Sequence, residues 1–60
     1  MTQAYAKEVV RGEVPDCSRQ EIAKAWQKLV DTGCVWSMGK YYSDMACALI
    51  ATGVVERNAA

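Results

Sequence analysis

Apolar residues recur at helical spacing in three stretches of the chain, and glycine or proline separates these stretches. The first pattern runs through residues 2–11 and ends at Gly12, and the second runs through residues 18–32 and ends at Gly33. A third pattern, over residues 40–52, is closed by Gly53. Alternation of apolar and polar residues occurs only over residues 34–38, which is too short for a convincing strand. We therefore predict an all-α fold, a small three-helix domain in which helices 2 and 3 form an antiparallel hairpin.

The first predicted helix is short and weakly amphipathic. Ala4, Tyr5, Val9 and Val10 fall near one face, and Thr2 is suited to cap the start of the helix. A turn over residues 13–16 follows, where proline prevents the helix from continuing. Two interpretations stay open for this helix, namely a docked element and a frayed arm.

The second predicted helix has the clearest start signal in the chain. Ser18 and Glu21 have the spacing of a capping box, and Cys17 and Ile22 occupy the positions of a hydrophobic staple. Gly33 stands where a left-handed residue closes a helix. The apolar stripe of this helix consists of Ile22, Ala25, Trp26, Leu29 and Val30.

The segment after Gly33 is predicted to be a helical turn or tight linker that carries Trp36 inward. In the third helix, the run from Met45 to Ala51 is apolar nearly all round, which is typical of a helix buried on two sides. The predicted inner face of this helix consists of Tyr41, Met45, Ala48, Leu49 and Thr52. The hairpin core is expected to form around Trp26, Leu29, Met45 and Leu49.

Sixty residues make one domain, which we divide into an N-terminal helix and turn (1–15), a helical hairpin core (16–54) and a frayed tail (55–60). A chain of this size buries only about 60% of its unfolded surface. Phenylalanine is absent, so two tryptophans and three tyrosines supply all the aromatic bulk. Because so thin a core must offset the entropy of folding, we expect a homodimer or higher oligomer.

Charge and hydropathy indicate where the protein is expected to act and which kinds of partner it is expected to bind. Seven basic and seven acidic side chains give a net charge of zero, and the two signs are interspersed. Nucleic-acid binding normally requires a one-signed basic face, so a nucleic-acid partner is not expected. The chain opens without a charged-then-apolar leader and contains no apolar run of transmembrane length. We therefore expect a soluble cytoplasmic protein with no membrane partner.

The residue types needed for catalysis or metal binding are sparse. Cys17, Cys34 and Cys47 show no C-x-x-C spacing, and the chain has no histidine. A zinc site would need further ligands, and a cysteine or serine nucleophile would lack its usual base. The cysteines are best interpreted as small hydrophobic residues in a reducing compartment, with a redox role left open. We predict a protein that is not an enzyme and has no cofactor and no metal.

One cluster has a functional interpretation. The bend between the second and third helices gathers aromatic residues, and Trp and Tyr are enriched at binding hot spots. A small domain without phenylalanine also needs such residues in its core, so Trp36 and Tyr42 are open to either role. The candidate partner-binding residues are Trp36, Met38, Lys40, Tyr41 and Tyr42.

The pattern W-Q-x-L-V-D-T-G-x-V-W…G-x-Y…A-x-A-L-I-x-x-G, between Trp26 and Gly53, resembles a group of very short, functionally uncharacterised accessory proteins of tailed bacteriophages. The group tends to have Leu-Gln-Gly and then Gly-Arg where this chain has Ser37-Met38-Gly39 and Ser43-Asp44. A role of that arginine therefore does not carry over. The resemblance implies an accessory protein that acts in the cytoplasm of the infected bacterial cell, and it supplies no catalytic residues.

These observations lead to one main hypothesis and two alternatives. The main hypothesis is a non-enzymatic phage accessory protein that binds and modulates a host protein, as an anti-defence or host-takeover inhibitor. The expected partner is a host or phage protein whose identity the sequence leaves open. The first alternative is a small helix-turn-helix-like regulator that binds DNA. The second is a structural homo-oligomer in which the third helix packs against its copy.

Overall fold

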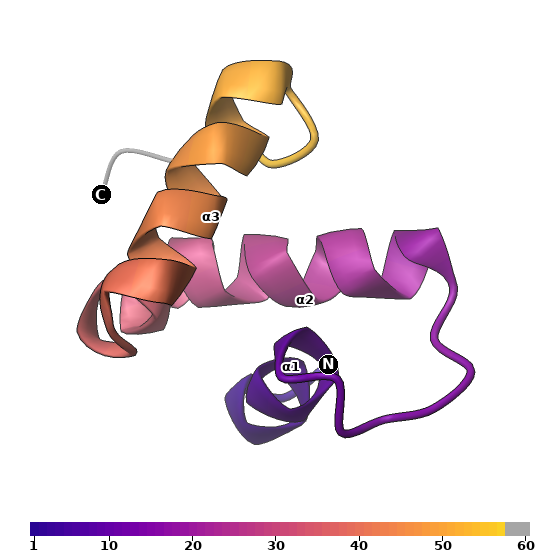
Figure 1. Cartoon of the computed structure of the whole chain (residues 1–60). Helices are drawn as coiled ribbons and strands as arrows, with labels where there is room; N and C mark the ends of the chain where they lie inside the picture. Colours follow the sequence, from indigo (N-terminus) through magenta and orange to yellow (C-terminus); the bar gives the residue numbers. More distant parts are fainter. Residues whose placement is uncertain (58–60) are drawn as a thin grey trace.

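The computed structural model describes residues 1–57 and shows three α-helices joined by two turns (Figure 1). The helices are α1 (Gln3–Val10), α2 (Arg19–Thr32) and α3 (Lys40–Thr52), and a short 3₁₀ helix, η1 (Cys34–Ser37), connects α2 to α3. No strand occurs within residues 1–57. The predicted all-α, three-helix fold is therefore confirmed.

The helix ends follow the local chemistry that the sequence indicates. The Ser18 hydroxyl accepts a hydrogen bond from the Glu21 backbone N–H at 3.2 Å, and the Thr2 hydroxyl accepts one from the Tyr5 backbone N–H at 3.2 Å. Gly33 closes α2 with φ of 75°, a left-handed conformation that favours glycine. These caps fix where each helix begins and ends, but they do not fix how the helices pack.

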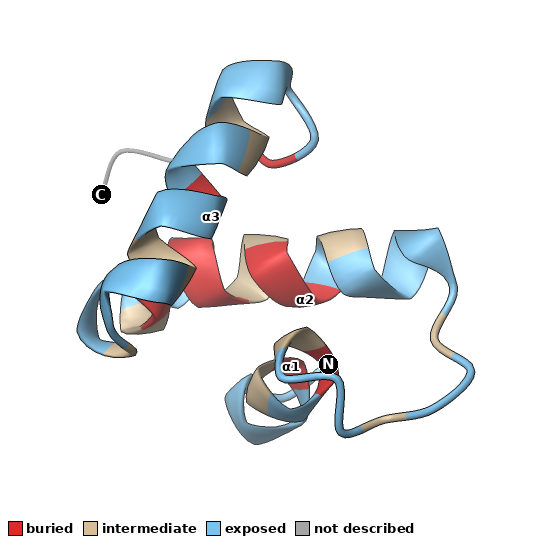
Figure 2. Cartoon of the chain, in the orientation of Figure 1, coloured by how far each residue is buried: buried red, intermediate tan, exposed pale blue. Residues whose placement is uncertain are grey.

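Helix α1 docks against α2 through small and branched side chains. Ala6 and Ala25 are both completely buried, and such small residues allow two helices to approach closely. Val9 is also buried, and Val10 packs against the core. The predicted inner face of α1 is partly wrong, because Ala4 and Tyr5 are exposed and Ala6 lies inside. Figure 2 shows the buried positions of α1 and α2 facing each other.

Helices α2 and α3 pack against each other around the turn, and α3 then leaves at a steep angle, so the hairpin is splayed (Figure 1). The residue that η1 carries inward is Val35, which is completely buried. The prediction that the turn would carry Trp36 inward is wrong, since 38% of Trp36 is exposed. A turn this short presents only some of its side chains to the core, and the aliphatic Val35 takes that position.

Helix α3 is rotated relative to the prediction. Ala46 is its fully buried residue, and Tyr42, Leu49 and Ile50 pack against the core. Met45, predicted to lie in the core, is 37% exposed. The expectation that α3 is buried on two sides is also wrong, because most of its surface is open (Figure 2).

The predicted frayed tail is docked as far as the structure describes it. Val55 is 1% exposed and ranks with Leu29 and Val35 as one of the largest fully buried side chains. Two hydrogen bonds join Glu56 to Gln27. The prediction of fraying is therefore wrong for residues 55–57, and its remainder, residues 58–60, lies outside the described residues.

Candidate partner-binding site

The aromatic residues at the start of α3 extend from the core to the surface. The ring of Tyr42 lies 6.1 Å from that of Trp26, centroid to centroid, and Trp26 is only 6% exposed. The ring of Tyr41 packs edge-on against Tyr42, with a centroid distance of 5.1 Å and an interplanar angle of 86°. Because Tyr41 is still 66% exposed, it is a large aromatic side chain held in place at the surface.

Trp36 reaches the surface from η1 and is accompanied by a charge. The guanidinium carbon of Arg57 lies 5.5 Å from the centroid of the Trp36 ring, within the range of a cation–π interaction. Gly33, the residue before η1, lies next to this ring, since a Cβ added there would be 3.9 Å from Trp36 Cδ1. The side chain of Trp36 is thus partly exposed to solvent and lies beside Arg57 of the tail.

The other two predicted site residues differ in exposure. Met38 is half-buried and packs against the core, whereas Lys40 is exposed at the first position of α3. The predicted site therefore contains three exposed side chains and two half-buried ones. We call these five residues the aromatic surface: Trp36, Met38, Lys40, Tyr41 and Tyr42.

Sequence reasoning missed three residues that complete this region, namely Gln27, Val55 and Arg57. A weak signal was present for Val55, because an aliphatic pair follows the glycine that ends α3. Gln27 and Arg57 gave no signal, since each acts on a residue at least 20 positions away.

A second polar cluster lies between α1 and the start of α2. The Tyr5 hydroxyl donates a long hydrogen bond of 3.5 Å to Glu21 Oε2. Desolvation, followed by the negative charge of Glu21, raises the pKa of the Tyr5 phenol. The same two causes raise the pKa of the Cys17 thiol. The arrangement keeps Cys17 protonated, which is unfavourable for a nucleophile.

This cluster leads to a prediction about thiol reactivity. We expect Cys47, which is exposed, to react with iodoacetamide first, and half-buried Cys17 to react slowest because its thiolate is disfavoured. The rate at Cys17 should keep rising with pH beyond the usual range of a thiol. Glu21→Gln should accelerate Cys17 and leave the Cys47 rate unchanged, as measured by mass spectrometry of digested samples. Equal acceleration at both cysteines would instead indicate general loosening of the fold.

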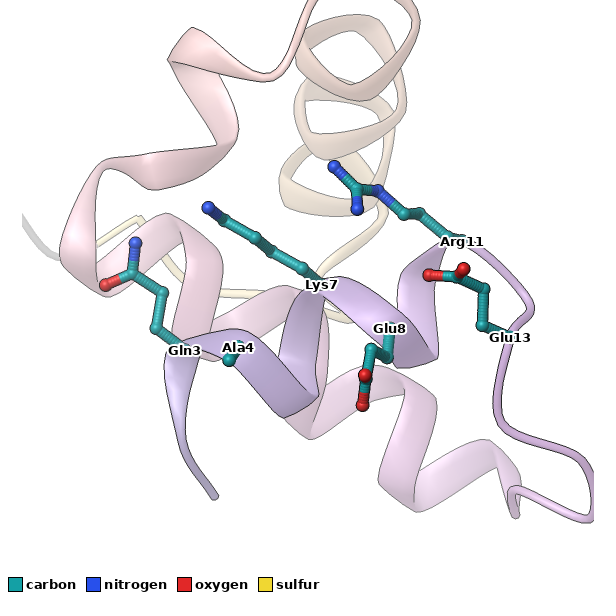
Figure 3. A pocket seen from close by; sticks show the side chains of 6 residues that line it. All are labelled: Gln3, Ala4, Lys7, Glu8, Arg11 and Glu13. Atoms are coloured by element: carbon teal, nitrogen blue, oxygen red, sulfur yellow. The ribbon is translucent and has the colours of Figure 1, made fainter.

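A shallow hollow lies along α1 and the turn that follows it (Figure 3). Its volume is about 640 Å³, and side chains of both charge signs line it. Lys7 and Arg11, one helical turn apart, extend to the same side of α1, and Glu8 points the other way (Figure 3). Such an open, mixed-charge hollow does not desolvate a ligand, so we assign it no role. Its lining residues are Gln3, Ala4, Lys7, Glu8, Arg11 and Glu13.

Within residues 1–57, no group of three or more His, Cys, Asp or Glu side chains is placed to hold a metal ion. In the same part of the chain, no helix has both the length and the apolar character needed to cross a membrane. The fold and its surfaces thus define the class as a small all-α domain with an exposed aromatic surface. Comparison of the chain with protein-family models, curated proteins and solved structures finds no match.

Proposed function

We propose that this chain is a non-enzymatic interaction protein that binds a partner protein through the aromatic surface. The observation that carries the proposal is Tyr41, which is 66% exposed and yet fixed by its edge-on contact with Tyr42. A fixed aromatic side chain loses little conformational entropy on binding, and such residues dominate interface energetics. Lys40 beside it adds a charge that favours an acidic or carbonyl-rich counterpart.

The identity of the partner is part of the proposal. We infer that the protein is an accessory protein of a tailed bacteriophage and that its partner is a host protein in the cytoplasm, which it inhibits. The support is the resemblance of the segment between Trp26 and Gly53 to short phage proteins, together with a size that favours binding over catalysis.

The proposal predicts that Tyr41→Ala separates binding from folding. Because a hot-spot truncation costs about 2 kcal/mol or more, the affinity for the partner should fall by about 30-fold or more, and capture should fall with it. Stability should change by less than about 1 kcal/mol, since most of the side chain is in solvent. Capture from host lysate with the tagged protein, quantified by mass spectrometry, measures the first effect, and thermal unfolding measures the second.

Lys24→Ala is the matched control, because Lys24 is an exposed residue of α2 outside the aromatic surface. Its capture should equal that of the unaltered protein. If Tyr41→Ala and Lys24→Ala capture the same proteins in the same amounts, the aromatic surface is not the binding site.

A second candidate function, self-association, is favoured by the exposed side of α3. That helix has exposed apolar residues that no other part of the described chain covers, namely Tyr41, Met45, Cys47 and Ala48. Sedimentation equilibrium up to millimolar concentration decides this candidate, and a monomer at every concentration would remove it. The DNA-binding alternative has less support, because the first turns of α3 present one cation, Lys40, and then an anion, Asp44.

A further inference from the structure

The tail of the chain, Val55–Arg57, is held by its backbone. Gln27 Nε2 donates a hydrogen bond of 2.7 Å to the Glu56 carbonyl, and the Glu56 N–H donates one of 2.8 Å to Gln27 Oε1. The primary amide of Gln27 thereby pairs with both polar groups of one residue, as a neighbouring strand would. Gln27 Nε2 also donates to Asp31 Oδ1 at 2.9 Å, which orients the amide.

The two neighbours of Glu56 supply side-chain recognition. Val55 is 1% exposed, and the Arg57 guanidinium carbon stands 5.5 Å from the Trp36 ring centroid. The side chain of Glu56 is exposed, and only its backbone is engaged. This surface therefore selects an aliphatic residue, then any residue, then a cation. We call it the tail seat, meaning Gln27, Trp36 and the core position that Val55 fills.

The connection between α3 and the tail carries little packing. Gly53 closes α3 with φ of 84°, and an added Cβ there would meet nothing within 4 Å. Val54, the next residue, is 53% exposed. Figure 1 shows the chain leaving the far end of α3 in an open loop before it returns towards α2. The N–H groups of Val54 and Val55 donate hydrogen bonds to the Leu49 carbonyl at 3.0 and 3.3 Å, which ties this connection to the end of α3 by its backbone. Side-chain recognition of the tail is concentrated in Val55 and Arg57.

We propose that the tail seat is a docking site for an extended segment of the partner protein, with an aliphatic residue followed two positions later by Arg or Lys. The chain's own tail then acts as a built-in competitor, and its displacement uncovers the ring of Trp36. Trp36 belongs to both the aromatic surface and the tail seat, so one partner reaches both. The inference rests on the proposed function, because it specifies the partner that the aromatic surface would bind.

The test supplies the segment in trans to a full-length chain whose own tail is weakened. In Val55→Ala, the loss of two methyl groups should lower the melting temperature by several degrees. The peptide acetyl-Val-Val-Glu-Arg-amide, which has the sequence of residues 54–57, is then added to millimolar concentration. We expect it to restore several degrees, because a ligand that binds only the folded state stabilises it by mass action.

Three altered peptides define the expected specificity. A peptide carrying Glu56→Gln should act like the original, because the seat engages only the backbone there. A peptide carrying Val55→Asp should have no effect, and one carrying Arg57→Glu should act at least several-fold more weakly. No stabilisation by any peptide, or equal stabilisation by all four, would overturn the proposal.

A second full-length variant covers the case in which Val55→Ala does not fold. Arg57→Ala leaves the core intact and uncovers Trp36, so it should bind the peptide several-fold more tightly than the unaltered chain, followed by tryptophan fluorescence. Equal affinities would contradict a competing tail. The unaltered chain could instead form a concentration-dependent dimer that is lost in Arg57→Ala. That result would assign the tail seat to a second copy of this chain and would contradict the proposal that it binds a different protein.

The outcome is separable from that of the proposed function, because peptide binding uses purified components only. Failure of the peptides leaves the Tyr41→Ala result standing. Peptide binding combined with unchanged capture by Tyr41→Ala would keep the tail seat and remove the aromatic surface.

Discussion

Val55→Asp is expected to unfold the protein, whereas Val54→Asp, one residue earlier, should leave it folded. Val55 is 1% exposed and fills the core beside Leu29 and Val35. An aspartate there would place an unpaired carboxylate in an apolar environment, at a cost of several kcal/mol. A domain of sixty residues has a total stability of about 3–9 kcal/mol. One buried charge therefore removes most or all of it.

Val54 is the matched control because it has the same side chain and is 53% exposed. Circular dichroism at 222 nm and thermal unfolding provide the measurement. Val54→Asp should keep its helical signal and melt within a few degrees of the unaltered chain. If Val55→Asp melts as Val54→Asp does, the tail does not contribute to the core and the docked conformation of residues 55–57 is wrong.

The comparison of Val55 with Ser18 shows which features a sequence can predict. Ser18, Gly33 and Gly53 act on backbone groups within a few residues, so the start of α2 and the ends of α2 and α3 follow from local chemistry. The docking of Val55 depends on α2 as well as on the adjacent α3, since Gln27 holds the neighbouring Glu56 from 29 positions away. The aliphatic pair after Gly53 is only a weak local signal, and it does not distinguish a docked tail from a frayed one.

The candidate site was predictable in part for the same reason. Tyr41 and Tyr42 stand out in the sequence because aromatic residues at a bend have few local roles. In the structure Tyr41 is exposed and Tyr42 is half-buried, which agrees with a surface residue anchored on a residue of the core. The exchange of Val35 for Trp36 as the inward residue depends on how the short η1 turn is rotated about its own axis, which local sequence does not fix. The Arg57–Trp36 and Gln27–Glu56 contacts span 21 and 29 positions, and no pattern along the chain encodes them.

The rotation of α3 leads to the second prediction with a large effect: Ala46→Asp should unfold the domain, and Met45→Asp should not. Ala46 is completely buried, and Met45 is 37% exposed. Every residue from 45 to 51 is apolar, so helical periodicity alone cannot select the inner face. The small side chain at position 46 is the one that permits close contact with the core. Aspartate there would overpack the core, which costs about 1–3 kcal/mol. It would also bury an unpaired charge, which costs several kcal/mol more.

The two variants share the same new residue on adjacent positions of one helix, so the lower helix propensity of aspartate contributes equally to both. Their difference in unfolding free energy in urea is consequently dominated by the burial of the new carboxylate, because the difference in helix propensity between Ala and Met is only a few tenths of a kcal/mol. We expect Met45→Asp to lose about 1–2 kcal/mol and to stay folded, since its side chain is 37% exposed and a carboxylate there can reach solvent. The reverse order would place Met45 in the core, turn the Tyr42 ring away from Trp26, and remove the support on which the exposed Tyr41 depends.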